Sequence, residues 1–126
     1  MSENNGLINK TELGGSISYS EDVIAIISGL AATEIEGVAG MSGGIKSGIG
    51  ELLGRKDLAK GIRASIQGDE AVIEVNLIAS YGALIHQVAQ EVQKNVKRAV
   101  ENMTGLRVTA VNINVQGVQV TPENNK

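Results

Sequence analysis

The sequence contains no cysteine, tryptophan or phenylalanine, and it has one histidine and one proline. The absence of cysteine excludes disulfides, thiolate zinc sites, iron–sulfur centres and cysteine nucleophiles. Aromatic residues are limited to two tyrosines, and 14 Asp and Glu residues outnumber 11 Lys and Arg residues, which gives a net charge of -3. Because a nucleic-acid binder normally has a basic excess or a set of stacking aromatics, nucleic acid is not an expected partner.

Long hydrophobic runs are also absent. The longest run, Val23–Ile27, has five residues, whereas about 20 are needed to cross a bilayer. Residues 1–10 are polar and Glu3 precedes the first lysine, unlike the basic start and apolar core of a secretory signal peptide. We therefore expect a cytoplasmic protein with no transmembrane segment of its own.

The chain length of 126 residues suits one domain. Both ends are polar and lack hydrophobic periodicity, which predicts a disordered N-terminal tail at 1–12 and a C-terminal tail at 121–126. The domain between them covers residues 13–120 and includes a glycine-rich segment at 40–60, which is predicted to be a flexible loop.

The first half of the domain contains signals for a strand, a helix and a second short strand. Gly15–Tyr19 alternates small or polar residues with apolar ones, as a strand with one buried face does. Ser20 offers an N-cap hydroxyl and Gly37 a left-handed stop, so we expect a helix between them and a brief strand at Val38–Met41. The buried face of this helix is predicted to contain Val23, Ile24, Ile27, Leu30, Ala31 and Ile35.

The second half predicts a hairpin, a long helix and a last strand. Period-two alternation begins at Ile62 and returns at Val72–Ser80 after a Gly/Asp turn, which is typical of a β-hairpin. Gly105 ends the helix and precedes a strand at Leu106–Val120, whose apolar phase shifts after Ala110 and so predicts a bulge. Buried positions are predicted to be Ile73, Val75, Leu77 and Ala79 in the returning strand, and Ile85, Val88, Val92, Val96, Ala99 and Met103 in the helix.

The order of these elements is β-α-(short β)-loop-β-β-α-β. This order favours an α+β fold in which two helices pack on one face of a mostly antiparallel sheet. The result would be a two-layer sandwich that is split-βαβ-like in its connections.

No motif predicts catalysis, a cofactor or a bound metal. Five glycines crowd into residues 43–54, but Ile45 separates Gly44 from Lys46, which breaks the P-loop pattern, and the dinucleotide spacing is not met either. His86 is the single histidine and has no companion at a usable spacing for acid–base work or metal binding. The sequence therefore favours a binding protein over an enzyme.

The glycine-rich segment also combines apolar residues at helical spacing with basic side chains. Residues 46–63 carry five basic and two acidic side chains, which leaves a local charge of +3. A basic amphipathic surface can rest on anionic lipid or dock on a protein partner; packing of its leucines onto the domain is the alternative. The candidate contact residues are Lys46, Ile49, Leu52, Leu53, Arg55, Lys56 and Lys60.

Six segments, spread over about residues 12–120, carry a similarity that is specific when they are taken together. They are Glu21–Ile27, Ala31–Met41, Tyr81–Gly82, Val88–Gln93, Glu101–Leu106 and Val115–Val118. With these segments the sequence closely resembles the alkaline shock protein family, the Gls-type general stress and envelope stress response proteins of Gram-positive bacteria.

The resemblance implies a small non-enzymatic cytoplasmic protein, without a cofactor, that supports envelope homeostasis under stress. The expected partners are a membrane-anchored protein that holds it at the inner face of the membrane, family paralogues and further copies of the chain as a homo-oligomer. Other members are linked to fatty-acid or acetyl-CoA carboxylase homeostasis. The alternative function is therefore a regulator that binds a lipid-synthesis enzyme or an acyl metabolite.

Overall fold

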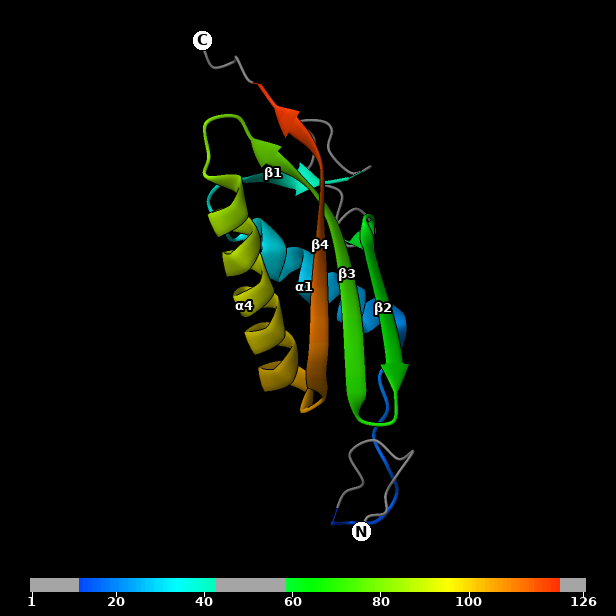
Figure 1. Cartoon of the computed structure of the whole chain (residues 1–126). Helices are drawn as coiled ribbons and strands as arrows, with labels where there is room; N and C mark the ends of the chain where they lie inside the picture. The colour runs from blue at the N-terminus through cyan, green and yellow to red at the C-terminus, as the bar shows by residue number, and fades with distance from the viewer. Residues whose placement is uncertain (1–11, 43–58, 121–126) are drawn as a thin grey trace.

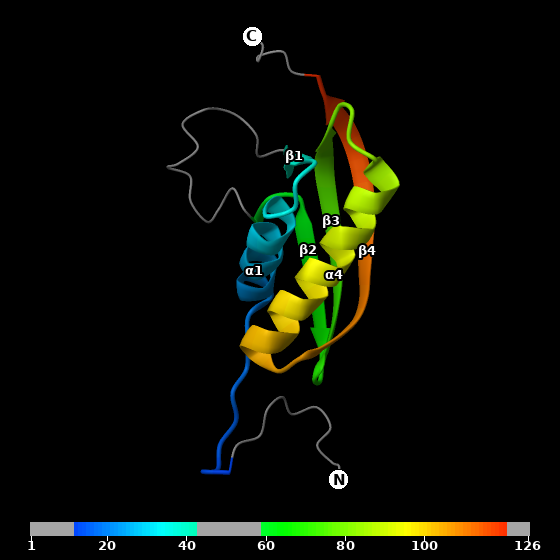
Figure 2. The same cartoon turned by 90° about the vertical axis from the view of Figure 1, so that its left-hand side faces the viewer.

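The computed structural model describes residues 12–42 and 59–120, which form a four-stranded sheet with two helices on one of its faces (Figures 1 and 2). Strand β3 (Glu70–Ser80) lies at the centre of the sheet. Strands β2 (Ile62–Gln67) and β1 (Val38–Met41) pair with β3 antiparallel, while β4 (Arg107–Gln119) pairs with β3 in parallel. The predicted α+β class, with two helices on a mostly antiparallel sheet, is confirmed.

Strands β1 and β2 share one edge of β3, and β4 occupies the other. β2 lies beside the first half of β3, with Ile62 opposite Val75, and β1 lies beside the second half, with Met41 opposite Leu77. The parallel strands β3 and β4 are direct neighbours. Their connection through the second helix is therefore a simple βαβ crossover, without the inserted strand of a split one.

The strand predicted at Gly15–Tyr19 is wrong. Residues 17–19 are in no strand, and Ser16 forms only an isolated bridge. Gly14 and Gly15 have φ angles of 101° and 80°, which an extended strand does not use. Both edges of β3 are already occupied by the other strands, so this short alternating segment has no central position in the sheet to take.

Helix α1 (Glu21–Thr33) starts as predicted, because the Ser20 hydroxyl accepts a hydrogen bond of 3.1 Å from the Val23 N–H. It ends before Gly37, whose φ of 104° belongs to the turn into β1. The buried face is rotated from the prediction, since Val23 and Leu30 are 42% and 48% exposed. Its members are Ile24, Ala25, Ile27, Ser28, Gly29, Ala31 and Ala32.

Helix α4 (Ile85–Thr104) buries a stripe with a constant spacing of four residues. Val88, Val92 and Val96 belong to it as predicted, but the stripe continues through Val100 and Thr104, and Met103 is 68% exposed. Rows of residues four apart are inclined to a helix axis, and α4 crosses the strands obliquely (Figure 2). The predicted stripe ran parallel to the helix axis, whereas the buried stripe follows the inclined row of residues four apart.

The hairpin and the core agree with the sequence pattern. β2 and β3 are joined by the two-residue turn Gly68-Asp69, and Gly68 has a φ of 63°, as a tight hairpin turn requires. The side chains of Ile73, Val75, Leu77 and Ala79 are all 0% exposed, so the predicted inner face of β3 is confirmed.

Strand β4 contains two irregularities. Ala71 pairs with Val108 but Val72 pairs with Ala110, so Thr109 is an extra residue on β4. Leu77 pairs with Val115 and Ile78 with Gly117, which makes Gln116 a second extra residue. The predicted shift of apolar phase is thus confirmed as a bulge, one residue earlier than the sequence placed it, and the second bulge is an addition.

Candidate interaction site at the outer edge of strand β4

The outer edge of β4 is a long stretch of backbone on which no other described strand pairs. Backbone groups of a strand alternate in direction, so every second residue presents its N–H and C=O groups on this edge. The N–H of Arg107 and the C=O of Gln119 bond toward the rest of the sheet, to Asp69 and Tyr81. Allowing for the two bulges, the residues that present their groups outward are Val108, Val111, Ile113, Val115, Val118 and Val120.

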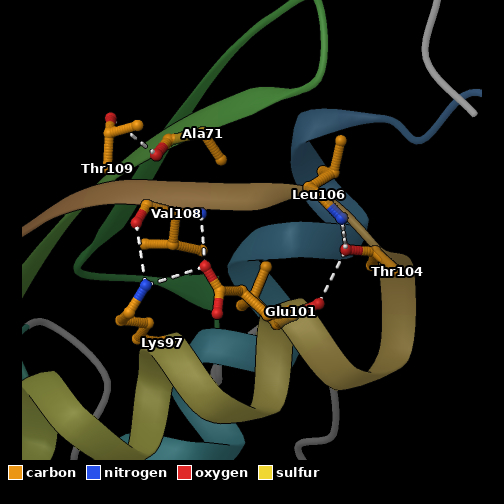
Figure 3. Close-up of polar contacts among 8 residues, drawn as sticks. Ala71, Lys97, Glu101, Thr104, Leu106, Val108 and Thr109 are labelled. Carbon is orange, nitrogen blue, oxygen red and sulfur yellow. Dashed lines mark hydrogen bonds and ion pairs between the residues drawn. The ribbon is translucent and has the colours of Figure 1, made fainter.

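The first part of this edge, Arg107–Asn112, is covered by side chains of α4, and we call it the covered half; Figure 3 shows its start at Val108. The Val108 N–H donates to Glu101 Oε2 at 2.9 Å, and Lys97 Nζ donates to the Val108 C=O at 3.3 Å. Further along, Gln93 Nε2 donates to the Val111 C=O at 2.9 Å. Three α4 side chains therefore bind three of the four outward N–H and C=O groups of Val108 and Val111, which an incoming strand would otherwise use. We call them the α4 clamp.

Two members of the α4 clamp, Lys97 and Glu101, also bind each other. Lys97 Nζ lies 2.8 Å from Glu101 Oε2, one helical turn away. The hydrogen bond from Lys97 lowers the pKa of Glu101 below its ordinary value of 4.5, and the backbone bond from Val108 adds to the same effect. Glu101 is therefore a carboxylate at neutral pH, as an acceptor for two donors must be.

The turn from α4 into β4 fixes the position of the clamp (Figure 3). Gly105 ends the helix with a φ of 81°, as predicted, and its N–H bonds to the Glu101 C=O. The buried Thr104 hydroxyl donates to the Val100 C=O at 2.6 Å and accepts from the Leu106 N–H at 3.0 Å. Because of these bonds, β4 begins immediately after the last turn of α4 and runs beside it.

The second part of the edge, Ile113–Gln119, is the open half. Within the part of the chain that the structure describes, no side chain binds the outward groups of Ile113, Val115 or Val118. The Val115 and Val118 side chains are 37% and 44% exposed. No charged residue occurs between Arg107 and Glu123. Natural proteins usually protect a strand edge with charges, prolines or a covering element, and the open half has none of these among its own residues.

A network of amide side chains on the opposite, helix-free face of the sheet holds the open half in place. Asn76 Oδ1 accepts from Asn114 at 2.9 Å and from Gln116 at 3.3 Å, and the Ser42 hydroxyl donates to Gln116 Oε1 at 3.1 Å. Asn114 also donates to Glu74. The second bulge of β4 is thus tied to the centre of the sheet and to the end of β1.

A backbone crossing at Gly61 supports this network. Asn76 donates from its backbone N–H and from its side chain to the Gly61 C=O, at 2.7 and 3.0 Å, while the Ser42 N–H donates to the Asn76 C=O at 2.9 Å. Gly61 has a φ of 83°, and a Cβ atom there would lie 2.8 Å from the Asn76 carbonyl oxygen. Only glycine fits this crossing without displacing the backbone.

Of the site residues expected from the sequence, the structure describes only Lys60. Lys46, Ile49, Leu52, Leu53, Arg55 and Lys56 lie outside the described residues, and Lys60 is exposed immediately before Gly61. His86 is exposed in the first turn of α4. The sequence signal for the α4 clamp is that Gln93, Lys97 and Glu101 each follow a buried valine of the α4 stripe by one position.

An open groove of about 290 Å³ lies beside the clamp, between α4 and β4. It is lined by Gln93, Lys94, Lys97, Val108, Thr109, Ala110 and Val111. Neither the length nor the hydrophobicity of any helix within residues 12–42 and 59–120 is sufficient to span a bilayer.

Comparisons with known proteins place this fold in a family. Residues 9–120 match the model of the alkaline shock protein 23 family, which is described as having a cell envelope-related function. The Bacillus subtilis protein YloU is 40% identical over 109 residues, which cover 85% of this chain and 91% of YloU. YqhY of the same organism is 34% identical over 105 residues, covering 83% and 78% of the two chains.

The comparisons also include more distant proteins. A stress response regulator Gls24 homologue of Streptococcus pyogenes is 24% identical over 106 residues, 83% of this chain and 59% of that protein. Among solved structures, a copper form of the MamM CTD covers 79% of this chain and 100% of its own, with a TM-score of 0.49 and 15% identity, too distant for any argument about function. The extent of the family match and the two Bacillus relatives establish that the chain belongs to the alkaline shock protein family of cell envelope-related and stress response proteins.

Proposed function

We propose that the chain is a non-enzymatic interaction protein of cell-envelope stress homeostasis. In this proposal it binds a membrane-anchored protein at the inner face of the membrane and associates with paralogues and copies of itself. The family description and the name of the Gls24 relatives support the link to envelope and stress. The observation that carries the interaction role is the open half of the β4 edge.

A strand edge is a binding surface that needs no catalytic or ligand-binding side chains. An extended segment of a partner can add to such an edge through main-chain hydrogen bonds, while exposed side chains along the strand select the partner. Here the outward backbone groups of Ile113 and the exposed side chains of Val115 and Val118 provide the two components. The amide network of Asn76 and Gln116 holds them in position before a partner arrives, which lowers the entropy cost of binding.

The basic segment remains a second predicted contact. Reversing the charges of Lys46, Arg55, Lys56 and Lys60 should leave the domain folded and weaken recruitment to anionic lipid or to a partner. Unchanged recruitment of that variant would remove the segment from the interface.

The test is a pull-down of tagged protein from detergent-solubilised native cells, with partners identified by mass spectrometry against an untagged control. The informative variant is Val118→Lys, which places a charge in the open half. Its matched control is Val72→Lys on β3, because Val72 has a similar exposure of 40% but lies on a central strand with no open edge.

We expect wild type and Val72→Lys to recover a small membrane protein together with family paralogues, and Val118→Lys to lose most of the paralogues. Equal recovery by all three proteins would show that the β4 edge is not the binding surface. Recovery of carboxylase or fatty-acid enzymes in place of a membrane protein would refute the envelope role in favour of the lipid-synthesis regulator.

A further inference from the structure

We infer that the open half of β4 pairs antiparallel with the open half of β4 in a second copy of the chain, about a two-fold axis that joins the two sheets edge to edge. This inference rests on the self-association in the proposed function and specifies its surface and its register. The occupant of the edge is thus an identical strand, and the α4 clamp determines where the pairing begins.

The charge distribution favours a second copy over a charged partner strand at this edge. The whole chain carries a net charge of -3, so two copies repel each other weakly at long range. The 15 positions from Val108 to Pro122 contain no charge, and two identical edges can therefore approach without like-charge contacts. Lys97 and Glu101 lie beside the covered half and stay away from the proposed contact.

The outward residues of the open half are complementary to themselves in one register. In an antiparallel pair, residues that exchange two hydrogen bonds lie opposite each other. If Val115 of one copy faces Val118 of the second copy, then Ile113 faces Val120, and every outward residue meets another outward residue. The bulge residue Gln116 then lies next to the two-fold axis in both copies, so the extra residue does not disturb the register.

The ends of the proposed ladder are determined by the chain itself. On the N-terminal side, the next outward residue is Val111, whose C=O already accepts from Gln93. On the other side, Pro122 has no backbone N–H to donate. Four residue pairs remain between these limits, and since each exchanges two bonds, the ladder holds about eight N–H···O bonds.

The register can be tested by cysteine cross-linking of the full-length chain, which has no native cysteine. Val115→Cys and Val118→Cys are purified separately, then oxidised alone and as a mixture. Opposed residues in a hydrogen-bonded pair have Cα atoms about 5.5 Å apart, within the range that a disulfide spans. We expect the mixture to form disulfide dimers at least about tenfold faster than either variant alone, because effective concentration favours only the opposed pair.

The control mixture is Val115→Cys with Val72→Cys, whose cysteine is similarly exposed on β3 and should link at the slow rate of random collisions. Equal cross-linking of Val115→Cys alone and of the mixture would overturn the proposed register. A chain that stays monomeric by sedimentation at all concentrations would overturn the pairing itself.

A second variant tests the surface independently of cysteine chemistry. Val118→Lys should weaken self-association in sedimentation by at least about tenfold, whereas Val72→Lys should not, with circular dichroism confirming that both remain folded. Unchanged association of Val118→Lys would also overturn the proposal. A pull-down that still recovers the membrane protein while the cross-linking fails would leave the proposed function standing and remove only the β4 pairing.

Discussion

The two halves of the β4 edge belong to one strand, yet they meet their surroundings in opposite ways. In the covered half, the backbone of Val108 and Val111 bonds to Gln93, Lys97 and Glu101 of α4. In the open half, the outward groups have no such partners among the described residues, although the amide network fixes the strand from the other face. An exposed strand edge is a template on which another chain can pair, and only the open half of β4 offers one.

The largest effect should come from a substitution that destabilises the whole domain and therefore both halves of the β4 edge. Val92 is 0% exposed in the α4 stripe, next to Gln93 of the clamp. Val92→Asp would bury an unpaired carboxylate, which should cost about 4 kcal/mol or more in the free energy of unfolding. Urea denaturation measures this loss, with Gln90→Asp on the exposed face as the control. Normal stability of Val92→Asp would contradict the packing of α4 on the sheet.

The next largest loss of stability should come from a substitution among the residues that support the open half. Gly61→Ala forces a Cβ atom against the Asn76 carbonyl at a φ of 83°, and we expect a loss of about 1–3 kcal/mol from strain and from the disturbed network. Gly82→Ala is the matched control, since Gly82 has a φ of 95° but nothing within 4 Å of its Cβ position. The difference between the two variants in urea denaturation isolates the contact with Asn76. Equal losses would mean that the left-handed backbone alone, and not the crossing, requires glycine.

A smaller effect should follow from removing one side chain of the amide network. Gln116→Ala deletes the bonds to Asn76 and Ser42, on an exposed face where each bond contributes about 0.5–1 kcal/mol at most. Gln119→Ala, for which no side-chain bond is seen among the described residues, should be near neutral. Gln116→Ala should lose more free energy of self-association than free energy of unfolding, because the bulge at Gln116 lies beside the proposed two-fold axis. Association equal to that of Gln119→Ala would show that the network does not prepare the edge.

The sequence predicted the strands better than the helix faces. Alternation in β3 reports burial well, because Ile73, Val75 and Leu77 at every second position are all 0% exposed, although Val72 on the opposite face is 40% exposed. In α1 the buried face includes Ala25, Ser28 and Gly29, and small residues of this kind do not distinguish an inner from an outer surface by their hydrophobicity. The large residues Val23 and Leu30 therefore rotated the predicted face away from the observed one, although Ile24, Ile27 and Ala31 are buried as predicted.

The candidate site could not be read from the sequence for a different reason. A polar residue such as Lys97 on a helix is by default a solvent-exposed one, and its bond to the Val108 backbone depends on where β4 lies in three dimensions. The uncharged run after Arg107 was visible, but whether it formed an edge or a central strand depended on the order of the strands. The tertiary arrangement of α4 and β4 therefore determines the site, whereas the local sequence pattern shows only the residues that are available to form it.

The smallest expected effect is a pH-dependent change in the covered half that the open half does not share. Because Lys97 and the Val108 N–H lower the pKa of Glu101, the folded state binds this proton less readily than the unfolded state does. The contribution of Glu101 to the clamp is therefore complete above the ordinary pKa of 4.5 and is lost as the pH falls through the lower pKa of the folded chain. The NMR shift of the Val108 amide should follow this loss with a midpoint below 4.5, and Glu101→Gln should abolish the step.

The amides of Ile113 and Val118 provide the comparison within the same sample, because no titratable side chain among the described residues bonds to them. Their shifts should not follow the Glu101 midpoint. If they moved with Val108, the covered and open halves would be coupled, and acidification would alter the binding surface as well as the clamp. If the shifts of Ile113 and Val118 stayed fixed while that of Val108 changed, the clamp would limit the length of the open half without affecting its conformation. The amide network on the opposite face of the sheet, which holds the open half independently of the clamp, favours this outcome.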